Sequence, residues 1–388
     1  MVGAAPCRVE AEAPAPRFHV EAGDPVAGFL RRHGWDWPRL ALAAFLIYGP
    51  IEKLVIPAIG GYLQLVGPVT TWVPDAEALL LGFVVFPYFF AYYLWAGPGI
   101  AEAFAALTGN EGFAGDARYP ALARRAGAAF GRPWWFVISI GFAALAVLAV
   151  HVVLWGPRAA VPPWFGATNG AHRALALVLI AAVGYVVAQI VVREVVAALW
   201  LSRVCAAMAD DLAVHPYHAD GAGGLGAIGR HAARCLYLLA TVAAFIGVGS
   251  LLPYLRGIGT LQVSFWNPLT AVLWAAFLVF VPFLFALLVR APHEAMCRAR
   301  DRRVNRVSAQ LDERLAAAEV SIAGDRAALP PILTDVARLK ELRALVEQDS
   351  PTWPFNQEIR QRIRLSVLLS VAQYVGTLLL TQLGLPPR

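Results

Sequence analysis

Seven long apolar runs divide the chain, and each is long enough to cross a membrane as a helix. The runs lie at residues 38–60, 78–96, 133–155, 174–193, 236–255, 269–290 and 365–383. About 20 apolar residues are enough to cross the hydrocarbon of a bilayer as an α-helix. The pattern therefore predicts an all-α, polytopic membrane protein with about seven transmembrane helices.

The fourth run does not stop where the membrane should end. Residues Val195–Ala207 remain apolar beyond Arg193 and Glu194. We therefore expect this helix to continue into the cytoplasm and to bury its apolar face against other parts of the protein.

The sixth run also continues, beyond Arg290, with apolar positions three and four residues apart as far as Leu315. After a break at residues 323–325, a second amphipathic stretch covers 333–346. This spacing predicts that residues 291–363 form a cytoplasmic antiparallel helical hairpin, which we interpret as the part that assembles subunits.

The last run carries polar side chains along one side of the helix from end to end. They are Ser366, Ser370, Gln373, Thr377 and Thr381. At about 100° per residue they fall within about 80° of one another, and leucine and valine cover the opposite side. Facing lipid, each would lose hydrogen-bond partners at a cost of about 1 kcal/mol or more. Two interpretations remain open: the stripe lines a water-filled path repeated around an oligomer axis, or it packs dry against neighbouring helices.

Composition supports a membrane location, and the charge distribution gives an orientation. Of the 388 residues, 59% are hydrophobic and only 15% are charged, with a mean hydropathy of +0.60. Soluble domains carry about 25% charged residues. With the amino terminus in the cytoplasm, the inner segments hold most of the 32 Lys and Arg residues. We therefore expect the amino terminus to be inside and the carboxyl terminus outside, in a bacterial inner membrane.

Four parts follow from this topology. Residues 1–34 are rich in Ala and Pro and are predicted to be a disordered cytoplasmic tail. Residues 35–290 hold six spans, with a cytoplasmic loop at 210–230. The assembly hairpin is 291–363, and the final transmembrane helix is 364–388.

The first run contains an acidic and a basic residue, Glu52 and Lys53, close to its middle. An ionisable side chain at such depth is a functional candidate. Adjacent residues of an α-helix do not face each other, so we expect them to pair only if the helix breaks at Gly49–Pro50. Alternatively the span ends at Ile51, and both side chains lie at the outer interface.

The most unusual polar stretch joins the fourth and fifth runs and is rich in histidine and glycine. It contains His215, His218, Asp220, Gly221, Gly223, Gly224 and Gly226. Three of the glycines match G-x-G-x-x-G, but no strand precedes them, so a turn with positive φ is favoured over a dinucleotide site. The His-x-x-His-x-Asp spacing suits metal ligands, although the spacings typical of zinc sites are absent. A gating or coupling role that includes proton sensitivity is the alternative.

Other signs of chemistry are few. The chain shows no nucleophile elbow, P-loop or kinase motif, so an enzyme is not favoured and no cofactor is expected. A basic cluster at residues 298–306 is interleaved with acidic residues further along. This pattern favours contact with anionic lipid of the inner leaflet over nucleic-acid binding.

In layout the chain resembles the seven-transmembrane ion channels that include insect odorant and gustatory receptors. The likeness consists of the cytoplasmic amino terminus, the prolonged fourth and sixth helices, the intracellular helices before the last span and the polar last helix. It includes no residue motif. The resemblance implies a homo-oligomer, in that family a tetramer, with the last helix lining a cation pore.

The leading hypothesis is a homo-oligomeric channel for ions or small solutes, lined by the last helix. The second is a secondary transporter or membrane scaffold whose stripe forms a dry helix interface. The third is a metal-dependent membrane enzyme that uses His215, His218 and Asp220.

Overall fold

The structure is a computed structural model in which every regular element is a helix. It describes residues 18–59, 79–110, 113, 116, 118–155, 170–256, 260–323, 329–361 and, in the last predicted span, 364, 368, 372, 375 and 379. The α-helices are α1 Pro25–Arg32, α2 Trp37–Leu46, α3 Ile56–Ile59, α5 Phe86–Thr108, α6 Arg118–Phe130, α7 Trp134–Trp155, α8 Gly170–Ala207, α9 Gly226–Arg256, α10 Thr260–Ala323 and α11 Leu329–Asp349. Two π-helices are η1 Ile47–Val55 and η2 Leu81–Val85. The predicted all-α class is confirmed for this part of the chain.

Three helical segments are long and apolar enough to cross a bilayer, which supports a membrane protein. They are Leu81–Thr108, Arg118–Ala149 and Arg173–Ala207, found among the described residues. Helix α7 also shows an apolar exposed face, which includes Val137 and Leu145. An apolar face of this kind is what a helix in contact with lipid presents.

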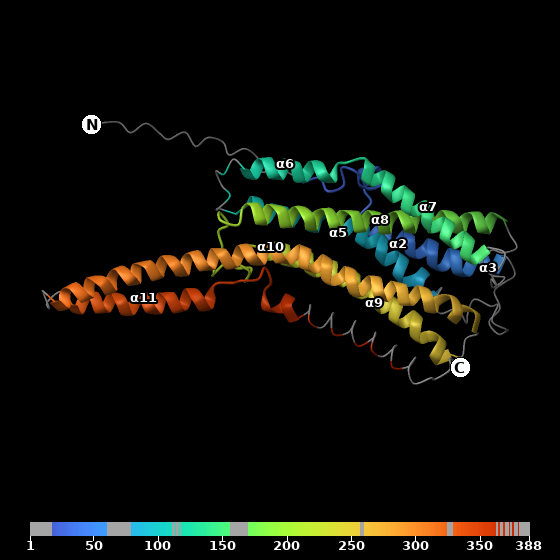
Figure 1. Cartoon of the computed structure of the whole chain (residues 1–388). Coiled ribbons are helices and arrows are strands. Elements are labelled where there is room, and N and C mark those ends of the chain that lie inside the picture. Colours follow the sequence, from blue (N-terminus) through green and yellow to red (C-terminus); the bar gives the residue numbers. More distant parts are fainter. Residues whose placement is uncertain are drawn as a thin grey trace, which may run out of the picture.

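Helix α8 lies at the centre of the bundle, against α5, α6, α7 and α10 (Figure 1). Its end beyond Arg193 is buried, with Leu201 and Cys205 fully enclosed in the largest apolar cluster. The predicted continuation of the fourth helix through Ala207 is therefore confirmed. Full burial of a leucine side chain stabilises the folded protein by roughly 1.5–3 kcal/mol, so these side chains contribute substantially to the stability of this end of the bundle.

Helix α10 is continuous over 64 residues, roughly 95 Å long. It ends at Ala323, at the predicted break, and α11 returns alongside it, so that the pair projects away from the other helices (Figure 1). Two ion pairs connect them, Arg300 with Glu347 and Arg314 with Asp335, each at 3.9 Å. Such exposed pairs contribute about 1 kcal/mol or less, so apolar contacts must supply most of the packing energy.

The amino-terminal segment differs from the sequence prediction. Residues 1–34 are predicted to be a disordered tail, but residues 18–34 are described and Pro25–Arg32 form helix α1. Asp24 caps this helix, because its carboxylate accepts hydrogen bonds from Val26 N at 3.0 Å and Ala27 N at 3.2 Å. Pro25 suits the first helical position, where its missing N–H would have no partner. The local Asp-Pro start signal outweighs the Ala- and Pro-rich composition of the preceding residues.

Candidate functional site

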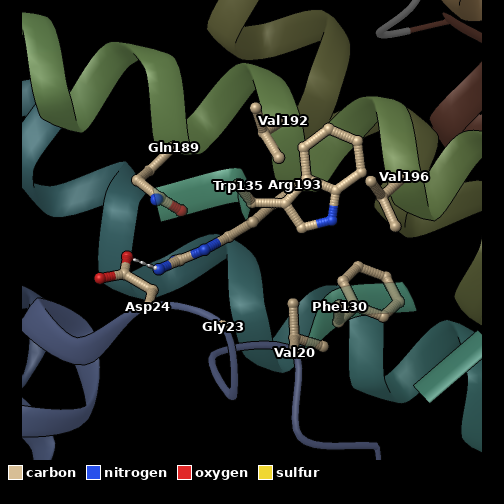
Figure 2. A pocket seen from close by; sticks show the side chains of 9 residues that line it. All are labelled: Val20, Gly23, Asp24, Phe130, Trp135, Gln189, Val192, Arg193 and Val196. Atoms are coloured by element: carbon tan, nitrogen blue, oxygen red, sulfur yellow. Dashed lines mark hydrogen bonds and ion pairs between the residues drawn. The ribbon is translucent and has the colours of Figure 1, made fainter. Parts of the chain in front are cut away.

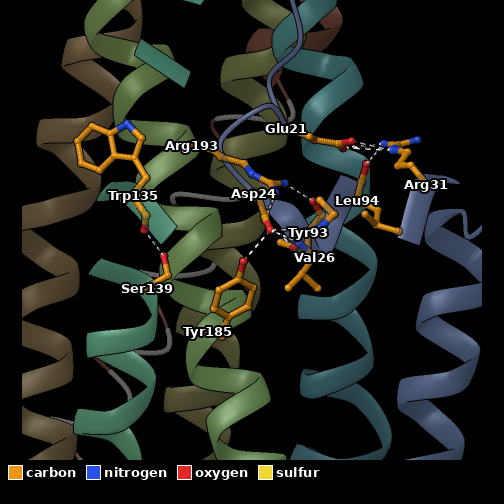
Figure 3. A network of polar contacts seen from close by, with 11 residues as sticks. Glu21, Asp24, Val26, Arg31, Tyr93, Leu94, Trp135, Ser139, Tyr185 and Arg193 are labelled. Atoms are coloured by element: carbon orange, nitrogen blue, oxygen red, sulfur yellow. Dashed lines mark hydrogen bonds and ion pairs between the residues drawn. The ribbon is translucent and has the colours of Figure 1, made fainter. Parts of the chain in front are cut away.

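Asp24 connects the amino-terminal segment to the bundle through a buried polar cluster. Arg193 Nη2 of α8 donates to Asp24 Oδ2, Tyr93 Oη of α5 donates to the same oxygen at 2.5 Å, and Tyr185 Oη of α8 donates to Oδ1 at 2.6 Å (Figure 3). We call Asp24, Tyr93, Tyr185 and Arg193 the ion-pair centre. It joins three segments that are far apart in sequence.

Both charged members of the ion-pair centre are almost completely buried. Asp24 is 2% exposed and Arg193 is 3% exposed. Removing each ion from water costs several kcal/mol, which only close pairing and further hydrogen bonds offset. Arg193 also donates from Nη1 to the Tyr93 carbonyl at 2.8 Å, and its guanidinium lies 4.6 Å from the centre of the Tyr93 ring. The centre therefore specifies where the segment docks more than it adds to stability.

A small cavity of about 10 Å³ lies beside the ion-pair centre (Figure 2). Its lining residues are Val20, Gly23, Asp24, Phe130, Trp135, Gln189, Val192, Arg193 and Val196. In the described part of the chain, neither Gln189 Nε2 nor Arg193 Nε has a hydrogen-bond partner. A volume of this size suits about one water molecule, to which both N–H groups would donate. The cavity is too small for an organic substrate.

Glu194 follows Arg193 directly and contacts α5 and α9. Tyr92 Oη of α5 donates to Glu194 Oε1 at 2.8 Å, and His231 Nε2 of α9 lies 3.3 Å from Glu194 Oε2. Nearby, Arg234 of α9 lies 3.5 Å from Glu102 and 5.0 Å from the centre of the Trp95 ring. Arg193 and Glu194 thus place two buried charged networks on adjacent sides of one helix.

The histidine- and glycine-rich loop is organised around the Asp220 carboxylate. Three backbone N–H groups donate to it, from Ala222 at 2.9 Å, Gly224 at 3.1 Å and Gly226 at 2.8 Å. Partial burial raises the pKa of the Asp220 carboxyl, but these hydrogen bonds outweigh burial and hold the pKa below its ordinary value. The carboxylate therefore fixes the loop immediately before α9 begins.

The predicted loop residues occupy a turn of the expected kind. Gly221, Gly223 and Gly224 have φ values of 63°, 68° and 93°, in the region that favours glycine. His218 Nδ1 lies 2.9 Å from Asp220 Oδ1, and the His215 backbone N–H donates to the Gly223 carbonyl at 3.2 Å. Among the described residues there is no group of three or more His, Cys, Asp and Glu side chains arranged to hold a metal ion.

Replacing Asp220 with asparagine should lower the free energy of unfolding by about 1–2 kcal/mol at neutral pH, because charged acceptors make the stronger hydrogen bonds. The folded-state pKa is depressed, so this contribution is present above the unfolded value of about 3.9 and is lost as pH falls through the folded value. Unfolding of both proteins should be measured from pH 7 down to pH 3. Asp210→Asn, at an exposed position of the preceding turn, is the matched control. A difference that persists unchanged at pH 3 would contradict the expected role.

The turn before the last helix packs against this loop. His293 Nδ1 donates to the Thr352 carbonyl at 2.6 Å, and its ring stacks on Trp353 with centroids 3.9 Å apart. A Cβ added at Gly229 of α9 would collide with the Pro354 carbonyl, so only glycine permits this approach. Asn356 caps the helix that follows this turn, because its side chain accepts from Ile359 N at 2.9 Å.

Glu52 and Lys53 are both buried and lie in contact, with Lys53 Nζ 3.0 Å from Glu52 Oε1. They belong to the π-helix η1, which also contains Gly49 and Pro50. A π-helix has more residues per turn than an α-helix, so the angle between consecutive side chains is smaller. Glu52 and Lys53 can therefore meet, whereas an ordinary α-helix would point them apart. The chain remains helical beyond Ile51, through α3.

The predicted pore-lining residues Ser366, Ser370, Gln373, Thr377 and Thr381 lie outside the described residues. The described positions of that span, Arg364, Leu368, Ala372, Val375 and Leu379, are all exposed. At about 100° per residue they form one side of a helix, opposite the predicted stripe.

Sequence reasoning missed the ion-pair centre. Asp24 directly before Pro25 is a helix-start signal, and Arg193–Glu194 interrupt an apolar pattern that continues beyond them. Together these were the signals that could have marked the site.

No known family model, characterised protein or solved structure matches this chain.

Proposed function

We propose that the chain is a subunit of an oligomeric membrane channel that passes ions or small solutes. The path is lined by Ser366, Ser370, Gln373, Thr377 and Thr381 of a seventh span. The amino terminus is cytoplasmic, the carboxyl terminus is outside, and α11 with the end of α10 forms the cytoplasmic assembly hairpin.

Exposed apolar side chains on α10 and α11 carry the proposal. Val320 is 73% exposed and Leu333 is 50% exposed, and Leu342 and Leu345 are also exposed. This part of the chain is rich in arginine, so it is expected in water rather than lipid. Exposed apolar groups on helices that project into water favour a protein partner. A path built from one helix per subunit needs such an assembly.

The last helix supports the same arrangement. Its described apolar positions Leu368, Ala372, Val375 and Leu379 are exposed and suit contact with lipid. The polar stripe falls on the opposite side of an ideal helix, where it faces protein or water. Water is the environment that satisfies hydroxyl and amide groups without specific partners.

Replacing Gln373 should change conduction in planar bilayers. Gln373→Leu should lower the unitary conductance several-fold because it removes a polar group from the path, and Gln373→Lys should in addition reduce cation currents by repulsion. Ala372→Leu, on the exposed side, is the matched control and should leave currents unchanged. Native mass measurement should show several copies per particle. Unaltered currents in both Gln373 variants, or a monomeric particle, would contradict the channel.

A secondary transporter is the second candidate, and one observation favours it. Asp24, Glu52 and Glu194 are carboxylates buried among helices. Ion-coupled transporters hold their coupling ions at such groups. Flux of an ion against its gradient, without unitary currents, would distinguish a transporter from a channel.

A further inference from the structure

Glu194 of α8 and His231 of α9 face each other inside the bundle. Glu194 is 2% exposed and His231 is 1% exposed. Their facing atoms, Glu194 Oε2 and His231 Nε2, are 3.3 Å apart, and neither has a hydrogen-bond partner in the part of the chain that the structure describes. The other carboxyl oxygen, Oε1, is already occupied by the Tyr92 hydroxyl at 2.8 Å.

The number of protons on this pair decides the charge that is buried. When the carboxyl group is ionised, the neutral imidazole donates its own proton from Nε2 to Oε2, and the buried pair carries a negative charge. With one proton more, Oε2–H donates to Nε2 and the imidazole proton lies on Nδ1, so the hydrogen bond is kept and the pair is neutral, which burial favours. With two, two donors would face each other and the pair would carry a net positive charge.

The surrounding charges disfavour the doubly protonated state. On α8 the neighbour is Arg193, and on α9 it is Arg234. Their carboxylate partners are Asp24 of the amino-terminal segment and Glu102 of α5. The uncharged titratable groups beside this cluster are Tyr92, Tyr88 and Cys235. A further positive charge beside two guanidinium groups would be repelled, whereas loss of the single proton would leave a negative charge that both attract.

We propose that Glu194 and His231 together form a buried binding site for one proton. The proton lies on the carboxyl group, and Glu194 Oε2–H donates to His231 Nε2. Burial and the nearby Arg234 guanidinium lower the pKa of His231 to about 4, in agreement with a neutral ring that accepts. The site alternates between one proton and none, and it does not depend on whether the last helix conducts.

The site also connects a proton to the docking of the amino-terminal segment. When the proton leaves, the pair gains a negative charge one residue from Arg193, which otherwise holds Asp24. Arg193 is then shared between two carboxylates. Release of the proton should therefore loosen Asp24 and the segment that carries it.

Infrared difference spectroscopy on the full-length protein in lipid, recorded as pH is raised, tests the proposal. The wild type should show the carbonyl band of a protonated carboxylic acid at neutral pH that disappears in alkali. Glu194→Gln should abolish this band, and His231→Gln should shift it because the acceptor changes. Glu294→Gln, an exposed carboxyl group of α10, is the matched control and should leave the band intact.

Nitrogen-15 spectra of the histidines in the wild type provide a second test that needs no variant. One buried ring should show an unprotonated, hydrogen-bonded Nε2 at neutral pH that alters in the same pH range as the infrared band. A wild type without a protonated carboxyl band at neutral pH overturns the proposal. A band that survives Glu194→Gln, or that His231→Gln leaves unshifted, overturns it as well.

Discussion

Replacing Asp24 with alanine is expected to lower the free energy of unfolding by about 3–5 kcal/mol. The change leaves the Arg193 guanidinium buried without its carboxylate, and an uncompensated buried charge is far more costly than a missing contact. It also removes the acceptor of the Tyr93 and Tyr185 hydroxyl groups. Chemical unfolding in detergent, followed by tryptophan fluorescence, measures the difference.

Asp36 supplies the matched control for this prediction. It caps helix α2 in the same way that Asp24 caps α1, accepting from Arg39 N at 3.1 Å, but its side chain is 56% exposed. Asp36→Ala should therefore cost only the cap, about 0.5–2 kcal/mol. The double variant Asp24→Ala with Arg193→Leu should recover part of the loss, because no unpaired charge remains. Equal losses at Asp24 and Asp36 would show that the ion pair contributes nothing beyond capping.

Replacing Gly229 with alanine is expected to have the second largest effect, a loss of about 3 kcal/mol. The new Cβ would overlap the Pro354 backbone carbonyl and would lie 2.9 Å from Phe355 Cδ1. A backbone carbonyl cannot move aside as a flexible side chain does, so α9 and the turn at residues 351–355 would separate. The midpoint of thermal unfolding in detergent measures the loss.

Gly127→Ala in α6 is the control, because an added Cβ there meets nothing within 4 Å. Alanine is a better helix former than glycine, so this change should raise stability by up to about 1 kcal/mol. The two substitutions are chemically identical and both lie in helices, yet they should shift stability in opposite directions. A gain at Gly229 would mean that the turn does not pack against α9 as described.

The helices of this protein follow from its sequence, but the candidate site does not. Apolar spacing correctly predicted that α8 continues beyond Arg193, because a buried helix face leaves a periodic mark in the chain. The Asn356 cap is likewise a local feature, since its acceptor lies within three residues of the N–H that it binds. Both features therefore follow from residues that are close together in the sequence.

The ion-pair centre depends on contacts that no local pattern contains. Asp24, Tyr93 and Arg193 meet only after three segments pack together, and periodicity gives the apolar side of a helix without naming the partner of a polar residue. The sequence predicts that Glu52 and Lys53 pair only if the helix breaks at Gly49–Pro50. The two side chains pair without such a break, because the backbone there is a π-helix rather than an α-helix.

The ion-pair centre has a consequence for the order of assembly. Asp24 is among the first of the described residues to leave the ribosome, yet its partner Arg193 lies 169 residues further along the chain. The early segment must therefore wait, undocked, while the intervening helices are made. Its closure onto α8 is a late event in biogenesis, after which the first half of the bundle is locked.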